Sequence, residues 1–170
     1  MLRGTIATVA TASIEAIFIA DKNGGPTRPV VSVNALAGRG LEGDRYCATQ
    51  PAPWIKEGEG RDVTLIEAEA LEALTAQTGI NLGADASRRQ LITRGIALNE
   101  LVGTRFEVGG VELLGRELAH PCRYLEKLTQ DGVLEGLANR GGLRAEILCS
   151  GEISVGDEIT VLDSGDVTPA

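Results

Sequence analysis

The clearest pattern of apolar and polar residues lies in the second half of the chain, where two strand-like runs flank a pair of glycines. Residues 105–108 read RFEV, residues 111–114 read VELL, and Gly109-Gly110 separates them. A tight hairpin turn needs positive φ angles at its two central residues, and glycine adopts them at no steric cost. The sequence therefore predicts a β-hairpin over residues 105–114.

Short runs rich in Val, Ile and Thr, bounded by glycine-containing turns, predict further strands. These runs cover residues 4–10, 14–20, 29–35, 62–66, 87–95 and 142–150 and the last part of 152–162. In the run 142–150, alternate side chains share one face, and Cys149 falls on the same face as Leu143, Ala145 and Ile147. We therefore expect Cys149 to pack in the core as a small apolar side chain.

Helical spacing of apolar residues is confined to a few segments. Residues 67–78 carry it most clearly and are followed by Gly79, a residue type that commonly ends helices in the left-handed conformation. Residues 22–26 and 37–45 are glycine-rich and are predicted as a turn and a loop. Shorter helical segments are predicted at residues 97–103, 123–130 and 133–138.

Many short strands with glycine turns and few helices predict a mainly β fold, a closed or nearly closed β-barrel with a few peripheral helices. The 170 residues fit one domain better than two. We expect this single domain to span residues 1–162 and the polar segment 163–170 to form a frayed tail.

Charge and cysteine content restrict the function classes. The formal net charge of −8 disfavours nucleic-acid binding, because a phosphate backbone requires a basic surface. The sequence contains no transmembrane helix and no signal-peptide core, so we expect no membrane contact. Three cysteines without metal-type spacing and a single histidine argue against a disulfide framework and a zinc site, and they favour a reducing, cytoplasmic location.

Cys122 is the cysteine with the most reactive surroundings. It lies in GRELAHPCRYL, between a predicted strand and a predicted helix, with His120, Arg116, Arg123 and Lys127 close in sequence. A helix N-terminus and nearby cations both favour the thiolate, the form that ligates soft metals, attacks sulfur donors and holds a persulfide. The alternative is an ordinary structural cysteine at the end of a strand, and local context does not decide between the two.

Of the 16 Lys and Arg residues, 13 are Arg, and three of these crowd one predicted strand. On a strand, Arg88 and Arg94 would share one face and Arg89 would point to the other. One interpretation is a phosphate clamp, to which Thr93 and the backbone at Gly95 add donors. The alternative is a set of salt bridges to the many Asp and Glu residues.

Two glycine-containing loops are weaker candidates. The consecutive glycines of residues 139–142 could turn backbone N–H groups toward one point and form an anion-binding nest beside Arg140. The loop around Asp44 and Arg45 offers a charge pair, and the alternative there is turn formation alone. We expect Cys47, just after this loop, to be partly exposed, and it could act as a resolving thiol only if the fold brought it close to Cys122.

Six segments, in this order, resemble the MOSC family, which is named after the C-terminal domain of molybdenum cofactor sulfurase. The resemblance covers about residues 30–162 and rests on the order and spacing of the segments, because each alone is a weak signal. The segments are GLEGDRY (40–46), DVTLIEAEAL (62–71), SRRQLITRG (87–95), FEVGGVELLG (106–115), HPC (120–122) and RGGLRAEILCSGEISVGDEI (140–159).

The resemblance implies a β-barrel of the pyruvate-kinase-barrel type and a site for the molybdenum cofactor, molybdopterin. It implies that Cys122 is the family's cysteine, which carries sulfur as a persulfide or ligates molybdenum, with His120 as a second catalytic candidate. It also implies that the Arg-rich strand helps to bind the pterin phosphate. The residues assigned to the cofactor on this basis are Arg88, Arg89, Thr93, Arg94, Arg123, Arg140, Asp44 and Arg45.

Two positions depart from the family pattern. Tyr46 stands where the first motif often has the His of GDRH, and Gln90 stands where the strand motif RRN has Asn. Tyrosine keeps a hydroxyl donor but does not shuttle protons near neutral pH, so a mechanism that needs an imidazole would have to use His120. These departures affect cofactor binding less than catalysis.

The sequence leaves three functions open. The first is an enzyme or sulfur carrier: an oxidoreductase that uses the molybdenum cofactor to reduce N-hydroxylated compounds, or a sulfur transferase, working with a redox or sulfur-donor protein. The second is a non-catalytic module that binds or stores the cofactor. The third is a barrel that keeps the shape without the ligand.

Overall fold

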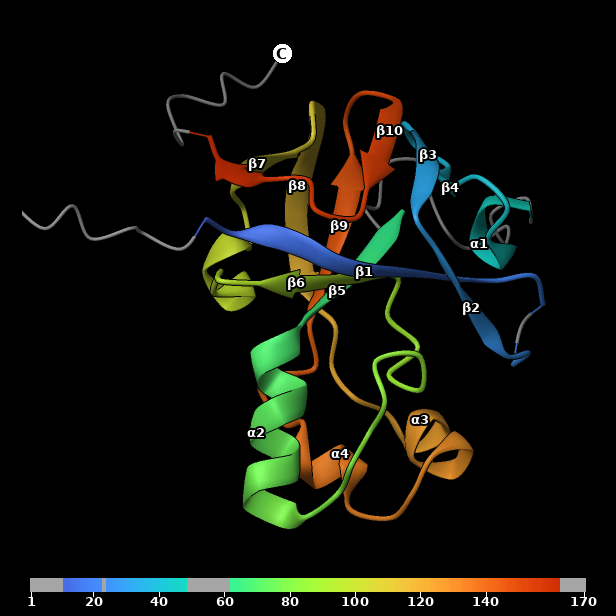
Figure 1. Ribbon diagram of the computed structural model, residues 1–170, viewed down its shortest axis with the longest axis vertical. Coiled ribbons are helices and arrows are strands. Elements are labelled where there is room, and N and C mark those ends of the chain that lie inside the picture. Colours follow the sequence, from blue (N-terminus) through green and yellow to red (C-terminus); the bar gives the residue numbers. More distant parts are fainter. Residues whose placement is uncertain (1–10, 23, 49–61, 163–170) are drawn as a thin grey trace, which may run out of the picture.

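The computed structural model describes residues 11–22, 24–48 and 62–162, and within them the fold is mainly β (Figure 1). The predicted strand 4–10 and the predicted tail 163–170 lie outside the described residues. In the described part of the chain, no helix combines the length and the apolar character that crossing a lipid bilayer requires.

Eight strands form one strongly curled sheet. Strands β5 and β6 run parallel, and the other neighbouring strands of this sheet are antiparallel. The spatial order is β11 (Ile159–Val161), β7 (Arg105–Val108), β8 (Val111–Leu118), β9 (Leu143–Ile147), β5 (Val63–Glu67), β6 (Leu91–Arg94), β1 (Ser13–Ala20) and β2 (Thr27–Val30). A second sheet consists of β10 (Gly151–Ser154), β3 (Ser32–Leu36) and β4 (Gly40–Leu41).

The main sheet is a half-barrel that is open rather than closed, which corrects the prediction of a closed or nearly closed barrel. The second half of β1 pairs with β2, so β2 and β11 remain as the two edges of the sheet. Ser13 of β1 and Glu158, which precedes β11, form one isolated bridge. Three backbone hydrogen bonds also link residues 12–14 to residues 156–159, but no strand ladder forms there, so the sheet remains open.

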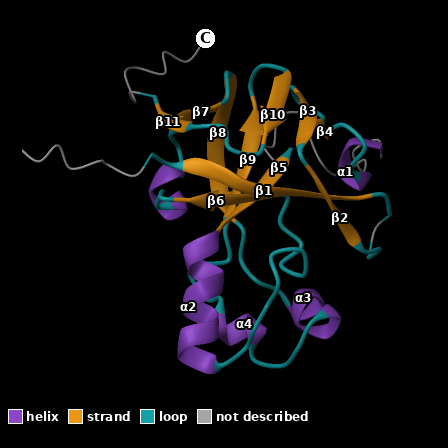
Figure 2. Cartoon of the chain, viewed as in Figure 1, coloured by secondary structure: helices purple, strands orange, loops and turns teal. Residues whose placement is uncertain are grey.

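The helices lie outside this sheet. Helices α2, α3 and α4 gather at one end of it (Figure 2), and α1 lies beside β4. Their bounds are α1 (Arg45–Ala48), α2 (Ala68–Thr78), α3 (Arg123–Leu128) and α4 (Val133–Gly136), with a 3₁₀ turn η1 at Leu98–Leu101.

The core has two parts. The larger cluster joins side chains of the curled sheet, such as Leu65 and Phe106, to Val33 and Ile153 of the small sheet. The smaller cluster contains Ile66 and Ile92, the neighbours of Leu65 and Leu91 on the opposite face of β5 and β6, together with apolar residues of α2, α3 and α4. β5 and β6 are thus covered on both faces, which makes them the rigid centre of the fold.

Two elements whose signals are local are confirmed. Helix α2 ends at Gly79, which has a φ of 76° and whose N–H donates to Thr75 O at 2.8 Å. The turn between β7 and β8 has φ angles of 55° at Gly109 and 92° at Gly110. The helix end and the hairpin turn both follow from glycine's freedom to adopt positive φ.

Other predicted strands are shorter than expected. The predicted strand 29–35 is divided at Val31, which is 81% exposed between β2 and β3. The predicted strand 87–95 begins only at Leu91, because Arg88 has a φ of 61° and lies in the preceding turn. The expectation that Arg88 and Arg94 share a strand face is therefore wrong.

Cys149 is exposed, which corrects the expectation that it packs in the core. The ladder of β9 ends at Ile147, and Leu148 is already outside it. The Cys149 Sγ accepts a hydrogen bond from the Glu112 N–H at 3.4 Å. Alternation places a side chain in the core only while the strand continues, and here the strand ends at Ile147, before Cys149 is reached.

Candidate functional site

Cys122 lies at the N-cap of α3, on the connection from β8, and its side chain is exposed. Its Sγ accepts a hydrogen bond from the Leu125 N–H at 3.5 Å. The predicted position between a strand and a helix is confirmed. A backbone donor directed at sulfur and an exposed position suit a thiol that reacts with another molecule.

A turn at residues 140–142 packs directly against the segment that leads to Cys122. The Ala119 N–H donates to Gly142 O at 2.8 Å. A Cβ at Gly141 would lie 2.4 Å from Ala119 O and 2.7 Å from Pro121 Cδ, so a larger residue there would push the two segments apart. The glycines of this turn therefore serve close backbone approach.

Arg89 connects these two segments. Its Nε donates to Gly141 O at 2.8 Å, and its Nη2 donates to Ala119 O at 3.0 Å and to His120 O at 3.4 Å. The side chain of His120 itself is exposed. Arg89, proposed from the sequence as a phosphate ligand, thus directs three of its hydrogen bonds to carbonyl oxygens.

Three ionisable groups influence the pKa of this guanidinium. Burial lowers the pKa of Arg89 to about 10, and the positive charge of Arg144 acts in the same direction. Attraction to Cys122 and to Tyr46 raises the pKa of Arg89. Since such effects weaken with distance, Arg144, Cys122 and Tyr46 all lie within electrostatic reach of Arg89.

Asp44 and Arg45 fix the position of Tyr46. The buried Asp44 carboxylate accepts hydrogen bonds from the Ala20 N–H at 2.9 Å and the Tyr46 N–H at 3.1 Å. The Arg45 Cζ lies 4.3 Å from the centroid of the Tyr46 ring, and Arg45 Nη2 donates to the Tyr46 hydroxyl at 3.2 Å. The Asp44 carboxylate therefore positions the backbone that carries Tyr46. The Tyr46 residue itself is 52% exposed.

Cys47 is buried, with 8% of its surface exposed, which corrects the expectation of a partly exposed loop cysteine. It lies in the single helical turn α1 rather than in a loop, and its Cβ faces Gly40. A buried thiol reacts slowly with reagents in solution.

Arg88 and Gln90 are the sequence neighbours of Arg89. Each has a buried donor without an acceptor among the described residues. Arg88 Nη1 donates to Gly25 O at 2.8 Å, but its Nη2 is buried and has no hydrogen-bond partner among the described residues. Gln90 is 4% exposed, and its Oε1 accepts the Thr64 N–H at 2.9 Å. This bond fixes the orientation of the amide and leaves Nε2 buried and unpartnered in the described structure.

Such orphaned donors are rare because each raises the free energy of the folded state by about 1–3 kcal/mol.

The sequence indicated Gln90 only as a departure from the family pattern and did not indicate Arg144. The alternation of β9, which turns Arg144 away from the core, was the available signal for the latter. Arg144 pairs across the sheet with Thr64, the residue that holds Gln90.

Three predicted cofactor residues lie outside this group. Thr93 is buried and donates to Ile66 O at 3.4 Å. Arg94 forms ion pairs with three glutamates, the salt-bridge alternative that the sequence left open; these are Glu15, Glu69 and Glu72. Arg140 Nε donates to Gly136 O at 2.9 Å, toward α4. Arg123, by contrast, is exposed on the first turn of α3, next to Cys122.

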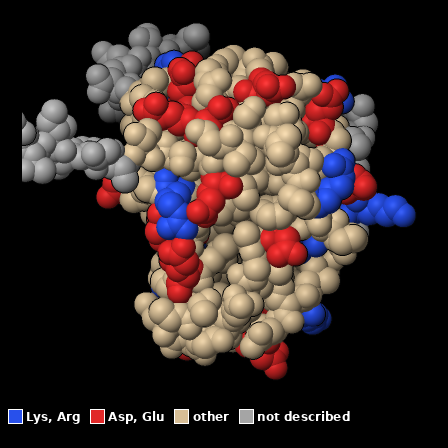
Figure 3. Space-filling model, viewed as in Figure 1, with Lys and Arg blue, Asp and Glu red and all other residues tan. Residues whose placement is uncertain are grey.

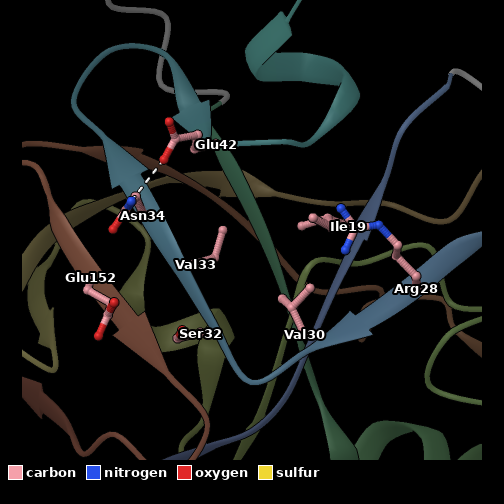
Figure 4. Close-up of a pocket in the computed structure, with 8 residues that line it drawn as sticks. All are labelled: Ile19, Arg28, Val30, Ser32, Val33, Asn34, Glu42 and Glu152. Atoms are coloured by element: carbon pink, nitrogen blue, oxygen red, sulfur yellow. Dashed lines mark hydrogen bonds between the residues drawn. The ribbon is translucent and has the colours of Figure 1, made fainter.

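The surface elsewhere offers weaker features. A hollow of about 290 Å³ lies among β1, β2, β3 and β10 (Figure 4), and none of its lining residues is a candidate from the sequence. Within it, Asn34 Nδ2 donates to Glu42 Oε2 at 2.8 Å. On the face shown in Figure 3, the acidic and basic side chains of the described residues are interspersed, without a broad basic surface.

The MOSC domain model matches residues 52–160, and the chain belongs to the MOSC domain family. This family is associated in general with binding of the molybdenum cofactor. A search of curated proteins found no match.

Solved structures support the same fold. The YuaD protein of Bacillus subtilis is 20% identical, with a TM-score of 0.74 over 89% of this chain and 95% of that one. YiiM from Geobacillus stearothermophilus is 15% identical, with a TM-score of 0.70 over 91% and 76% of the two chains. YiiM from Escherichia coli is 17% identical, with a TM-score of 0.65 over 88% and 69%.

Proposed function

We propose that the protein binds the molybdenum cofactor beside Arg88 and Gln90 and presents Cys122 to it as a thiolate or persulfide. The observation that carries this proposal is the pair of buried, unpartnered donors, Arg88 Nη2 and Gln90 Nε2, on either side of the arginine that contacts the Cys122 segment. Buried donors without acceptors mark a place where a ligand can supply the acceptor atoms.

The residues present fit such a ligand. Phosphate and pterin oxygens accept hydrogen bonds, and guanidinium groups match phosphate geometry. Arg88 and Gln90 would hold these acceptors. Arg144 would join them by exchanging its ion pair with Glu117, whose Oε1 lies 3.8 Å from Arg144 Nη1. The described residues contain no group of three or more His, Cys, Asp or Glu side chains able to hold a metal ion by themselves. The molybdenum, which supplies the redox chemistry, would therefore depend mainly on the cofactor's own ligands.

As a sulfur carrier, Cys122 would work by thiol exchange. Its thiolate attacks the outer sulfur of a persulfide on a donor protein, the donor S–S bond breaks, and the donor leaves as a thiolate. Cys122 then holds the transferred sulfur as a persulfide next to Arg89. As a reductase of N-hydroxylated compounds, the protein would instead need electrons from a redox partner.

A non-catalytic cofactor-binding module is the second candidate. Tyr46 occupies the position near Arg89 where the family pattern often has His, and a phenol does not shuttle protons near neutral pH. His120 is exposed and contacts Arg89 through its carbonyl oxygen. This arrangement favours binding over turnover unless the ligand or its partner supplies the proton.

Metal and pterin contents of purified protein test the proposal. From a host supplied with molybdate, wild-type protein is expected to carry close to one molybdenum and one pterin per chain, by elemental mass spectrometry and by fluorescence of the oxidised pterin. Cys149→Ala, which removes the other exposed thiol, should match it. If Cys122 contacts the metal, Cys122→Ala should lose molybdenum by about tenfold while retaining pterin, since one of few soft ligands is removed.

Equal molybdenum in Cys122→Ala and wild type would keep the cofactor site and assign Cys122 to sulfur transfer alone. Protein that contains neither molybdenum nor pterin, and that takes up neither when the isolated cofactor is added, would contradict the proposal and favour a barrel without ligand.

A further inference from the structure

Three hydrogen bonds from one guanidinium hold together two segments that are distant in sequence. Arg89 contacts Gly141 O, in the turn before β9, and Ala119 O and His120 O, in the segment that leads from β8 to Cys122. A guanidinium is planar and its donors have a fixed fork geometry, so these bonds fix the distance and orientation between the two segments.

We propose that Arg89 is a positioning residue that holds Cys122 in place by fastening its segment to the 140–142 turn, rather than a ligand for phosphate. The inference relies on the proposed function only in taking Cys122 as the working thiol. The test of the Arg89 role needs no cofactor. The Arg89 role can therefore be wrong while cofactor binding is right, and cofactor binding can be wrong while the Arg89 role is right.

The backbone around Arg89 is built for this contact. Gly141 has no Cβ, which lets the turn approach Ala119 and Pro121 more closely than any other residue type would allow. The Ala119 N–H to Gly142 O bond adds a fourth link at 2.8 Å. If Arg89 were turned toward a phosphate, three carbonyl oxygens would lose a donor, and two of these hydrogen bonds are partly buried, so the change is unfavourable.

Arg89 also carries its charge in a fixed place. It is partly buried, so salt and water screen its charge less than that of the exposed Arg123. With a pKa of about 10 it remains protonated at neutral pH. The guanidinium therefore keeps all its donors for the three carbonyl oxygens.

Alkylation by iodoacetamide at neutral pH, with each cysteine resolved by mass spectrometry, tests the proposal. The rate at Cys122 is divided by the rate at Cys149, which is exposed and serves as an internal reference in the same molecule. Arg89→Met is expected to lower this ratio severalfold, because the segment that carries Cys122 loses the side-chain hydrogen bonds that fix its position against the 140–142 turn. Arg28→Met, which removes an exposed arginine paired with Asp21, should leave the ratio unchanged.

Two further variants separate position from charge and cover the case in which Arg89→Met does not fold. Arg89→Lys keeps the charge but has no fork, and it should recover only part of the ratio. Gly141→Ala keeps Arg89 but forces the segments apart, and it should also lower the ratio. A wild-type ratio in Gly141→Ala, or in folded Arg89→Met, would overturn the proposal, and so would complete recovery in Arg89→Lys.

Discussion

Replacing Gly142 with alanine is expected to lower the free energy of unfolding by about 4 kcal/mol, through backbone strain and a steric clash together. Gly142 has a φ of 113°, and a Cβ there would lie 2.0 Å from Leu65 O. Leu65 is fully buried in β5, the strand covered on both faces, so its carbonyl has little freedom to move aside. Urea unfolding followed by circular dichroism measures the change.

Gly156→Ala is the matched control for this variant. Gly156 also has a positive φ, 93°, but a Cβ there would meet nothing within 4 Å. Only backbone strain is added, so a loss of about 1 kcal/mol is expected. Equal losses in the two variants would show that the close approach to Leu65 contributes nothing and would remove the structural reason for glycine before β9.

Arg88→Met is expected to weaken binding of the pterin cofactor about 30-fold, which corresponds to roughly 2 kcal/mol for a lost charge-assisted hydrogen bond. The empty protein should change in unfolding free energy by less than about 1 kcal/mol, because the variant loses the bond to Gly25 O but also removes a buried donor without a partner. Titration of the cofactor followed by fluorescence, with thermal unfolding of the empty protein, measures both quantities.

Arg28→Met controls for the general loss of a positive charge and should bind the cofactor as the wild type does. An Arg88→Met variant that binds normally would place the cofactor away from Arg88. A large loss of stability without a loss of affinity would show instead that the guanidinium is a structural group.

Features encoded by neighbouring residues could be predicted from the sequence, because their chemistry is local. Gly109-Gly110 gave the hairpin and Gly79 gave the end of α2, since each supplies a positive φ where the chain needs one. The position of Cys122 between a strand and a helix followed from the same kind of signal.

Features that depend on distant partners could not be predicted. Arg88 lies in the turn before β6 in a left-handed conformation. Its guanidinium donates to Gly25 O, 63 residues away in sequence. The Asp44 carboxylate accepts a hydrogen bond from the Ala20 N–H, 24 residues earlier in the sequence. The choice between a clamp and salt bridges at Arg94 was decided by glutamates on β1 and α2, which only the fold brings near.

The open half-barrel has a consequence for association between copies of the chain. Every open sheet has edges at which a strand from another molecule could add and start an aggregate. Here the edge strand β2 contains Pro29, which has no N–H to donate, beside the charged Arg28. The other edge, β11, is only three residues long. Neither edge offers a long row of backbone donors, so the protein can leave its sheet open without making it a template for edge-to-edge aggregation.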